Sequence, residues 1–202
     1  MRLYHSPTTP FGRKVMVLIL ELGLQDRIDI ADVMGTPLAP GTLPVDQNPL
    51  GKIPALQTED GVIYDSRVIC RYLNDLAGGA MYPGGAAQWK TLTLEATIDG
   101  ILEAALAMVY EVRLRPADKQ FPEWIEAQWL KAARALDVIE ADWMDHLSGP
   151  LTMPQIAMGC ALDYLDFRLD ARGWRDGRPK LAAWAAEFAD RPAMLATKPV
   201  AV

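Results

Sequence analysis

The spacing of apolar residues changes near residue 80, and this change constrains the fold more than any other feature of the sequence. Before it, short apolar runs alternate with turn residues, whereas after it apolar residues recur at helical spacing over long stretches. The pairs Gly78-Gly79 and Gly84-Gly85 flank the change, and glycine pairs interrupt helices and strands alike. We therefore expect two domains, a mixed α/β domain over residues 1–78 and an all-α domain over residues 86–202.

The first domain is predicted to have the order β-α-β-loop-β-β-α. The helix between the first two strands gives a parallel crossover, and Asp60-Gly61 predicts a hairpin between the third and fourth strands. This order is the thioredoxin-like arrangement, in which the hairpin adds an antiparallel edge to a parallel pair. The expected elements are a strand at 3–5, a helix that Gly23 ends, a strand at 28–31, a loop at 35–49, strands at 53–57 and 62–64, and a helix that begins at Asp65-Ser66.

The second domain is predicted to consist of helices alone. A long helix covers residues 86–114, and Pro116 and Pro122 mark the break that follows it. Thr152 and Gln155 form the pattern of a capping box, which predicts the start of a helix. The other helices are expected to end at Leu147 before Gly149-Pro150, to cover residues 154–172, and to lie at 179–189 and 192–196.

Charge and composition argue against several functional classes. The net charge is −6 and the sequence pI is about 4.9, so neither nucleic acid nor an anionic membrane surface is an expected partner. The sequence has no apolar run of signal-peptide or membrane-spanning length, and we expect a cytoplasmic protein. Cys70 and Cys160 lie in apolar helical patterns and give no zinc spacing with His5 and His146, so we expect no disulfide and no metal.

Three segments of the first domain resemble the glutathione-site motifs of the glutathione transferases. They are Ser-Pro-Thr-Thr-Pro-Phe-Gly-Arg-Lys-Val at 6–15, Asn-Pro-Leu-Gly-Lys-Ile-Pro-Ala-Leu at 48–56 and Asp-Ser-Arg-Val-Ile at 65–69. Residues 153–168 and 191–194 resemble the central helix and the closing segment of the family's helical domain. The resemblance covers essentially the whole chain and is closest to bacterial members with Ser or Thr at the glutathione site. It implies a cytosolic glutathione S-transferase with the GST fold, glutathione as co-substrate, and a homodimer.

Thr9 is the residue that the resemblance assigns to catalysis. In the family, the hydroxyl just before Pro-Phe donates to the glutathione sulfur and stabilises the thiolate. Thr8 and Ser6 are nearby alternatives, and Thr9 could also be a plain N-cap ahead of Pro10. This segment contains no cysteine, so the thiol chemistry of glutaredoxins and omega-type reductases is not expected.

Five further residues are candidates for glutathione binding. The resemblance implies that Pro54 is cis, with the N–H and C=O of Ile53 free for the cysteinyl part of glutathione. Lys52 could hold the glycyl carboxylate electrostatically. Ser66, at a helix N-terminus, is expected to bind the γ-glutamyl carboxylate, and Asp65 the ammonium group. From the residues alone, Pro54 could begin a strand, Lys52 could be a solvated loop charge, and Asp65-Ser66 could be a helix cap.

A second substrate, electrophilic and partly apolar, is expected between the domains, where pockets tend to form. Phe11, Tyr110 and Arg113 are the candidates for its lining, and the last two share a helix face because they lie three apart. Ordinary packing for Tyr110 and a salt bridge for Arg113 are the alternatives. The resemblance implies that Asp99 reaches the glutathione of a partner subunit, although an exposed helical Asp is an alternative.

The function expected from these motifs is the addition of the glutathione thiolate to a small electrophile, as in detoxification. Two alternatives stay open: a non-enzymatic binding or regulatory protein with the same fold, and glutathione-dependent peroxidase activity. The motifs do not identify the electrophile, because a fold does not fix a substrate.

Overall fold

The computed structural model describes residues 1–200 and divides the chain into two compact units. The first unit joins Met1–Pro83 to the segment that begins at Pro192, and the second spans Gly84–Arg191. The fold is the expected one, a small mixed-sheet domain and a helical domain. The last segment differs from the sequence prediction, which counted residues 192–202 with the second domain; residues 201–202 lie outside the described residues.

Arg13 fastens this last segment to the first unit. α8 (Pro192–Ala196) packs against α1 (Pro10–Glu21). The buried guanidinium of Arg13 donates through Nη2 to the Met194 carbonyl at 3.1 Å and through Nε to Thr197 Oγ1 at 3.3 Å. Because a hydrogen bond to a charged group contributes about 1.5–3 kcal/mol, these contacts stabilise the packing of a helix too short to be stable alone.

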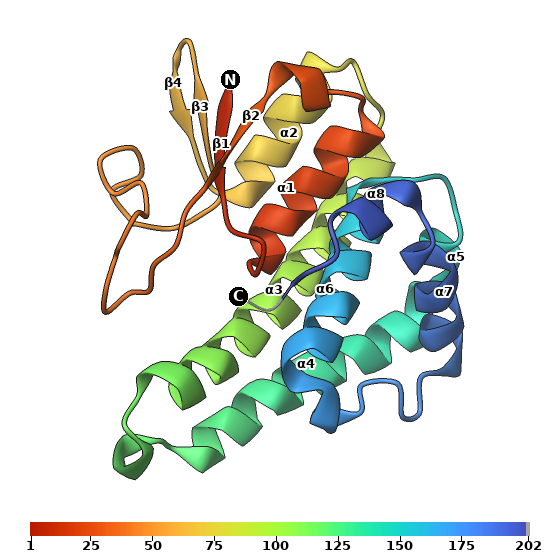
Figure 1. Cartoon of the computed structure of the whole chain (residues 1–202). Coiled ribbons are helices and arrows are strands. Elements are labelled where there is room, and N and C mark those ends of the chain that lie inside the picture. The colour runs from red at the N-terminus through yellow and green to blue at the C-terminus, as the bar shows by residue number, and fades with distance from the viewer. Residues whose placement is uncertain (201–202) are drawn as a thin grey trace. The chain divides into compact units, whose positions relative to one another are not determined.

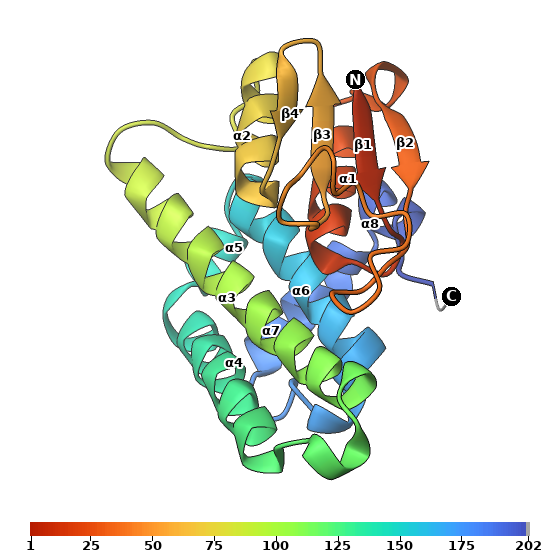
Figure 2. The same cartoon turned by 90° about the vertical axis from the view of Figure 1, so that its left-hand side faces the viewer.

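The first unit contains a four-stranded sheet with the strand order β2-β1-β3-β4. β1 (Arg2–His5) pairs in parallel with β2 (Asp29–Asp32) and antiparallel with β3 (Ala55–Thr58), which pairs antiparallel with β4 (Gly61–Ile63). α1 and α2 (Ser66–Leu76) pack against each other and cover one face of the sheet (Figures 1 and 2). The predicted order of strands and helices is confirmed.

The core of the first unit lies between the sheet and these two helices. Leu3 and Leu56 occupy paired positions on β1 and β3 and are fully buried. The apolar stripes of α1 and α2 are buried as well, through Val15, Leu18, Ile69 and Leu73. Each such side chain contributes about 1.5–3 kcal/mol when it leaves water, so these residues fix the helices on the sheet.

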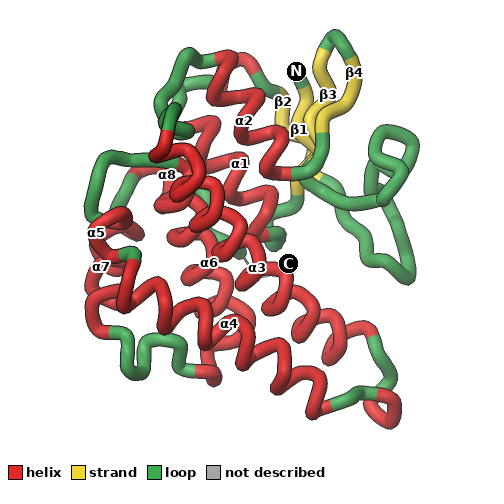
Figure 3. The backbone as a smooth tube through the Cα atoms, turned by 180° about the vertical axis from the view of Figure 1, so that it is seen from behind, coloured by secondary structure: helices red, strands yellow, loops and turns green. Residues whose placement is uncertain are grey.

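A long loop connects β2 to β3 and is green in Figure 3. Turns and a single bridge between Thr36 and Ala39 shape this loop, which contains no helix at any of its described positions. A Cβ at Gly35 would collide with the Pro40 carbonyl, so the tight return of the chain requires glycine there. The prediction of a Pro- and Gly-rich loop over 35–49 is confirmed.

The second unit is a bundle of helices. α3 (Ala86–Leu114) packs against α4 (Pro122–Asp142) and α6 (Met153–Leu169), and α7 (Pro179–Ala189) packs against α4 and α6. Every residue from 153 to 162 is buried, which makes the first part of α6 the centre of the bundle. Short 3₁₀ turns lie at Ala117–Lys119 and Asp170–Arg172 in this unit, and a third lies at Gln25–Arg27 in the first unit.

Two predicted helix ends in this unit are wrong. The helix expected to continue to Leu147 breaks at Trp143, where φ is −118° and ψ is 2°, and α5 (Met144–Leu147) follows. The apolar spacing continues through the break, so spacing alone could not locate it. The helix expected to reach residue 172 ends at Leu169, and Gly173, with φ at 58°, caps the 3₁₀ turn that follows.

The predicted capping box at the start of α6 is confirmed. Gln155 Oε1 accepts from the Thr152 N–H at 3.0 Å. Gln155 Nε2 donates to the Pro150 carbonyl at 2.7 Å and to the His146 carbonyl at 3.2 Å. A carboxylate could not donate to these two carbonyls, which explains why a neutral amide occupies this position.

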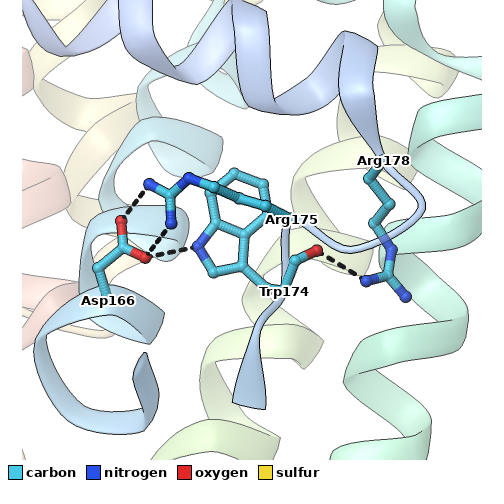
Figure 4. A network of polar contacts seen from close by, with 4 residues as sticks. All are labelled: Asp166, Trp174, Arg175 and Arg178. Atoms are coloured by element: carbon cyan, nitrogen blue, oxygen red, sulfur yellow. Dashed lines mark hydrogen bonds and ion pairs between the residues drawn. The ribbon is translucent and has the colours of Figure 1, made fainter. Parts of the chain in front are cut away.

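A polar network fastens the loop between α6 and α7 (Figure 4). Asp166 accepts from Trp174 Nε1 at 2.7 Å and from both terminal nitrogens of Arg175 at 2.6 Å and 2.7 Å. Arg178 donates to the Trp174 carbonyl at 2.7 Å and pairs with Asp137 at 2.6 Å. These charge-assisted bonds join the loop to α6 through Asp166 and to α4 through Asp137.

Candidate functional site

Strand register brings the predicted glutathione-site residues of the first unit to one end of its sheet. β1 ends one residue after Tyr4, which pairs with Ala55 at the start of β3, so Ile53-Pro54 lies beside the end of β1. β4 runs antiparallel to β3 and therefore finishes at the end of the sheet where β3 begins. α2 begins soon afterwards at Ser66. Thr9 lies in the turn that leads out of β1. Three chain segments that are distant in sequence converge here.

Thr9 is the N-cap residue of α1, but its side chain makes no capping hydrogen bond. Its N–H donates to the Ser6 carbonyl at 3.1 Å, and its own carbonyl accepts from the Arg13 N–H at 3.0 Å. Within residues 1–200 its hydroxyl has no hydrogen-bond partner. Thr9 therefore occupies the N-cap position ahead of Pro10, as the alternative predicted, but its side chain does not cap the helix. The alternative hydroxyls of Ser6 and Thr8 lie 3.4 Å from each other.

The first turn of α1 also presents backbone donors. Pro10, at the first helical position, has no N–H, and the described residues provide no acceptor for the N–H groups of Phe11 and Gly12. Unpaired N–H groups at a helix N-terminus favour an anion. This helix end therefore combines the Thr9 hydroxyl with two backbone donors. Phe11, a predicted lining residue for the second substrate, is half-buried at the same turn.

The side chains of His5 and Thr9 both lie against Gly12, and the roles of His5 and Gly12 were missed by sequence reasoning. A Cβ added to Gly12 would stand 2.6 Å from Thr9 Cγ2 and closer still to His5 Nδ1, so only glycine allows this approach. His5 is 7% exposed, and its Nδ1 has no hydrogen-bond partner in the described chain. Burial lowers the pKa of His5 although the charge of Asp32 acts to raise it, so the imidazole is neutral at pH 7. Gly12 itself was the signal in the sequence, because glycine is disfavoured within a helix and its presence in the first turn indicates a packing reason.

Ile53 and Pro54 are joined by a cis peptide bond, as the resemblance implies. Ile53 is half-buried, and neither its N–H nor its C=O has a hydrogen-bond partner among residues 1–200. Asn48 holds the preceding loop, since its buried Nδ2 donates to the Lys52 carbonyl at 2.8 Å and its Oδ1 accepts from the Leu50 N–H at 3.0 Å. The Lys52 side chain is exposed and forms no ion pair with any described residue.

Asp65 caps α2, which confirms the capping alternative for this residue. Its Oδ1 accepts from the Arg67 N–H at 2.9 Å, and its Oδ2 lies 3.1 Å from Arg67 Nη2. Burial acts to raise the pKa of the Asp65 carboxyl, but the hydrogen bonds and charge of Arg67, with the charge of Lys14, outweigh it and the pKa is lowered. Asp65 is therefore ionised at neutral pH with a cation already beside it.

Ser66 is the first residue of α2 and is 3% exposed. Neither its N–H nor its hydroxyl has a partner in the described part of the chain. The fully buried Lys14 adds positive charge near this helix end, as its effect on the pKa of Asp65 indicates. The N-terminus of α2 therefore offers an anion two donors in a positive environment. No pattern in the sequence indicates that Lys14 adds positive charge at this helix end.

The other predicted site residues lie on α3 in the second unit. Tyr110 is 36% exposed, and burial raises its pKa although Arg113 acts to lower it. Arg113 is exposed and makes no salt bridge within residues 1–200, so its salt-bridge alternative is wrong. Asp99 is 2% exposed, so it is not the exposed helical residue of the alternative. Its contact with a partner subunit stays a prediction.

The described part of the chain has no metal cluster. No group of three or more His, Cys, Asp and Glu side chains is arranged there to hold a metal ion. Cys70 and Cys160 are both buried and are not joined in a disulfide. Of the described helices, none has the length and apolarity that crossing a membrane requires.

Both halves of the chain match family models of the glutathione S-transferases. Residues 8–76 match the N-terminal domain of the family, and residues 122–187 match its C-terminal domain. The chain is 34% identical to the uncharacterized GST-like protein YibF of Escherichia coli over 98% of both chains.

Solved structures show the same relationship. A glutathione transferase family member from Pseudomonas fluorescens Pf-5, crystallised with bound glutathione, has a TM-score of 0.96 and 43% identity over 99% of both chains. A second structure of a family member from this bacterium, with bound S-(propanoic acid)-glutathione, has a TM-score of 0.92 and 42% identity over 100% of both chains. With both domains matched and similarity over the full length, this chain belongs to the glutathione S-transferase family.

Proposed function

We propose that this chain is a glutathione transferase that binds glutathione at the converging end of its first unit's sheet. The observation that carries the proposal is a set of polar groups without partners among the described residues: the Thr9 hydroxyl, the backbone of Ile53, and the N–H and hydroxyl of Ser66. The groups of Thr9 and Ser66 gather where α1 and α2 begin, and such helix ends favour an anionic polar ligand. A relative with 43% sequence identity was crystallised with bound glutathione, which supports glutathione as this ligand.

Each part of glutathione finds a complementary group in this arrangement. Ile53 pairs with the cysteinyl backbone as an added strand would. The N–H and hydroxyl of Ser66 bind the γ-glutamyl carboxylate at the N-terminus of α2, where a negative charge is favoured. Asp65 holds the γ-glutamyl ammonium, and Lys52 attracts the glycyl carboxylate.

Thr9 and the N-terminus of α1 stabilise the thiolate in this proposal. A free thiol titrates near 8.5, and lowering its pKa by two units requires about 2.7 kcal/mol of preference for the charged form. A hydrogen bond from the Thr9 hydroxyl to the sulfur supplies about 1.5–3 kcal/mol. The helix end supplies about 0.3–1 kcal/mol more. The two contributions together reach the required value without a metal ion.

The thiolate then attacks a small electrophile, and Phe11, Tyr110 and Arg113 contact this second substrate. We extend the proposal to a cytoplasmic homodimer that acts in detoxification, with Asp99 reaching the partner subunit's glutathione, and with neither nucleic acid nor membrane as partner. A molecular mass in solution equal to one chain would contradict the dimer.

A non-enzymatic glutathione-binding or regulatory protein is the second candidate. The observation that favours it is the Asp65 carboxylate, which Arg67 already engages through two contacts. A weakly held γ-glutamyl ammonium would reduce glutathione affinity. Turnover of an organic hydroperoxide would instead identify the peroxidase activity, which uses the same thiolate.

Calorimetric titration of glutathione into the protein and into Ser66→Ala tests the proposal. Loss of a hydroxyl that binds a carboxylate should weaken binding about tenfold, or about 1.4 kcal/mol. Arg134→Gln is a matched surface control, because Arg134 is exposed and lies on α4. Absence of glutathione binding to the unmodified protein would refute the proposal. Binding without turnover of any electrophile would favour the second candidate.

A further inference from the structure

The last turns of α3 and α6 carry two arginines, each one turn after a tyrosine. Arg113 follows Tyr110 on α3, and Arg168 follows Tyr164 on α6, at spacings that place each pair on one helix face. α3 and α6 pack against each other, and Figures 1 and 2 show that they run in the same direction. The two last turns therefore lie at the same end of the bundle. We call these four residues the double-arginine cluster.

Three carboxylates on α3, α6 and α4 are engaged by other arginines. Glu111 on α3 lies 2.8 Å from Arg115. On α6, Asp166 binds Arg175 through both of its oxygens at 2.6 Å and 2.7 Å (Figure 4). On α4, Glu126 likewise pairs with Arg172 at 2.6 Å.

Arg113 and Arg168 form no ion pair with any residue of the described chain. The chain as a whole has a net charge of −6, so carboxylates are plentiful and the missing partners are notable. Arg113 is exposed and Arg168 is half-buried, so both guanidinium groups can reach a solute. Two neighbouring cations without a counter-charge attract an anion.

The tyrosines add hydrogen-bond donors to this positive end. Burial raises the pKa of Tyr110, and it raises the pKa of Tyr164 to about 12 against the effects of Arg168 and Arg113. Both phenols therefore keep their protons at neutral pH. The Tyr164 side chain is already hydrogen-bonded with Arg168, which leaves the Tyr110 hydroxyl as the available donor. Arg168 lies over the Phe167 ring at 4.0 Å, which places an apolar surface beside the charge. Two cations without an ion pair in the described chain and the Tyr110 hydroxyl fit a carboxylate attached to an apolar body.

A structural role for the arginines makes a different prediction. A cation in the last turn of a helix interacts with the helix dipole and supports the fold. That role explains the charge of each arginine by itself, but it does not require two tyrosines beside them or the absence of an ion pair at both arginines. Under the structural role, substitution changes stability and leaves the choice of ligand unchanged.

We propose that the second substrate carries a carboxylate, which Arg113 and Arg168 bind with a hydrogen bond from the Tyr110 hydroxyl. The statement that this ligand is a substrate rests on the proposed transferase function. The binding of an organic anion by the cluster does not rest on that function, and the two parts can be tested separately.

The kinetic test compares 4-fluoro-3-nitrobenzoate with the matched 4-fluoro-3-nitrobenzamide. In both, the sulfur lone pair of the glutathione thiolate forms a C–S bond, the C–F bond breaks, fluoride leaves with its electron pair, and the thiol proton goes to solvent. Each kcat/KM is divided by the uncatalysed rate with glutathione, which removes the intrinsic difference in reactivity. We expect the unmodified protein to favour the benzoate.

Arg113→Gln and Arg168→Gln should each lower the benzoate-to-benzamide ratio by about tenfold, as expected for loss of a charge-assisted contact. Arg134→Gln, which removes an exposed arginine from α4, should leave the ratio unchanged. Equal use of both compounds by the unmodified protein would overturn the inference. A ratio that survives both substitutions would overturn it as well.

A binding measurement separates this inference from the proposed function. Ligand-observed NMR with 4-nitrobenzoate and 4-nitrobenzamide reports binding without any reaction. Binding of the benzoate alone, weakened in Arg113→Gln and Arg168→Gln, supports the anion site even if no electrophile is turned over, in which case the transferase function alone fails. If glutathione is turned over with neutral electrophiles but the benzoate does not bind, the inference alone fails.

Discussion

Replacing Gly12 with alanine tests the close approach of Thr9 and His5 to the first turn of α1. Alanine is favoured over glycine in a helix by about 0.8–1.0 kcal/mol, so propensity alone predicts a more stable protein. The added methyl would, however, stand 2.6 Å from Thr9 Cγ2 and closer to His5 Nδ1, both of which must then move. Overpacking of this kind costs about 1–3 kcal/mol. We therefore expect Gly12→Ala to lower the free energy of unfolding by about 0–2 kcal/mol.

Gly100→Ala is the matched control for this substitution. Gly100 lies in the interior of α3, and a Cβ there meets nothing within 4 Å. The same gain in helix propensity then acts without a collision, so Gly100→Ala should raise the free energy of unfolding by about 1 kcal/mol. The two glycine substitutions are thus expected to differ by about 1–3 kcal/mol in the free energy of unfolding.

Urea denaturation of the two variants and the unmodified protein measures this difference. Because the displaced atoms include Thr9 Cγ2, Gly12→Ala should also reduce the reactivity of bound glutathione, whereas Gly100→Ala should not. A Gly12→Ala variant as stable as Gly100→Ala would refute the close packing of His5, Gly12 and Thr9. Lower stability with unchanged reactivity would refute the link from this packing to the thiolate.

Two further predictions concern the same end of the first unit. Thr9→Val keeps the side-chain shape but removes the donor, so the pKa of bound glutathione, followed by thiolate absorbance, should rise by about one to two units, while Thr9→Ser should keep it low. An unchanged pKa in Thr9→Val would transfer the role to Ser6 or Thr8. Burial lowers the pKa of His5 from 6.5, so its contribution to stability is complete above pH 6.5 and is lost as the pH falls through the lowered value. His5→Asn should therefore reduce the acid-side decline of the urea midpoint, and an identical decline would contradict the buried neutral imidazole.

Most element boundaries could be predicted because residues that end helices and strands mark them. The helix predicted over 86–114 occupies the predicted range, since Gly85 precedes it and Pro116 follows it. The break at Trp143 could not be predicted, because the apolar spacing runs through it and no glycine or proline stands there. Glycine and proline therefore allowed the ends of helices to be predicted where these residues occur. The break at Trp143 was missed because neither residue marks it.

The return of the last segment to the first unit could not be predicted either. The sequence shows a short helix over 192–196, and proximity along the chain suggested that it belongs with the helices before it. The structure attaches it to α1 through the buried Arg13, whose partners lie more than 180 residues away, as the Met194 and Thr197 contacts demonstrate. A contact of this range depends on tertiary packing, which neither periodicity nor capping patterns encode.

The two helix N-termini of the first unit illustrate what sequence reasoning could and could not decide about the site. Thr9 and Asp65 both stand at N-cap positions, and in each case the capping alternative was open. The structure resolves them in opposite ways, because Asp65 accepts from the Arg67 N–H while the Thr9 side chain caps nothing. A helix start predicts that a polar side chain is present but does not predict its rotamer, which depends on neighbours such as Gly12.

This difference between the two helix ends suits the two anionic groups of the proposed ligand. At α1, the uncapped end keeps the Thr9 hydroxyl and the N–H groups of Phe11 and Gly12 for a thiolate, which must be stabilised only when the ligand is present. At α2, Asp65 caps one donor permanently and leaves the N–H and hydroxyl of Ser66 for a carboxylate that is charged at all times. A side-chain cap on α1 would compete with the sulfur for the same donors. The missing cap on α1 is therefore a requirement of the proposed chemistry.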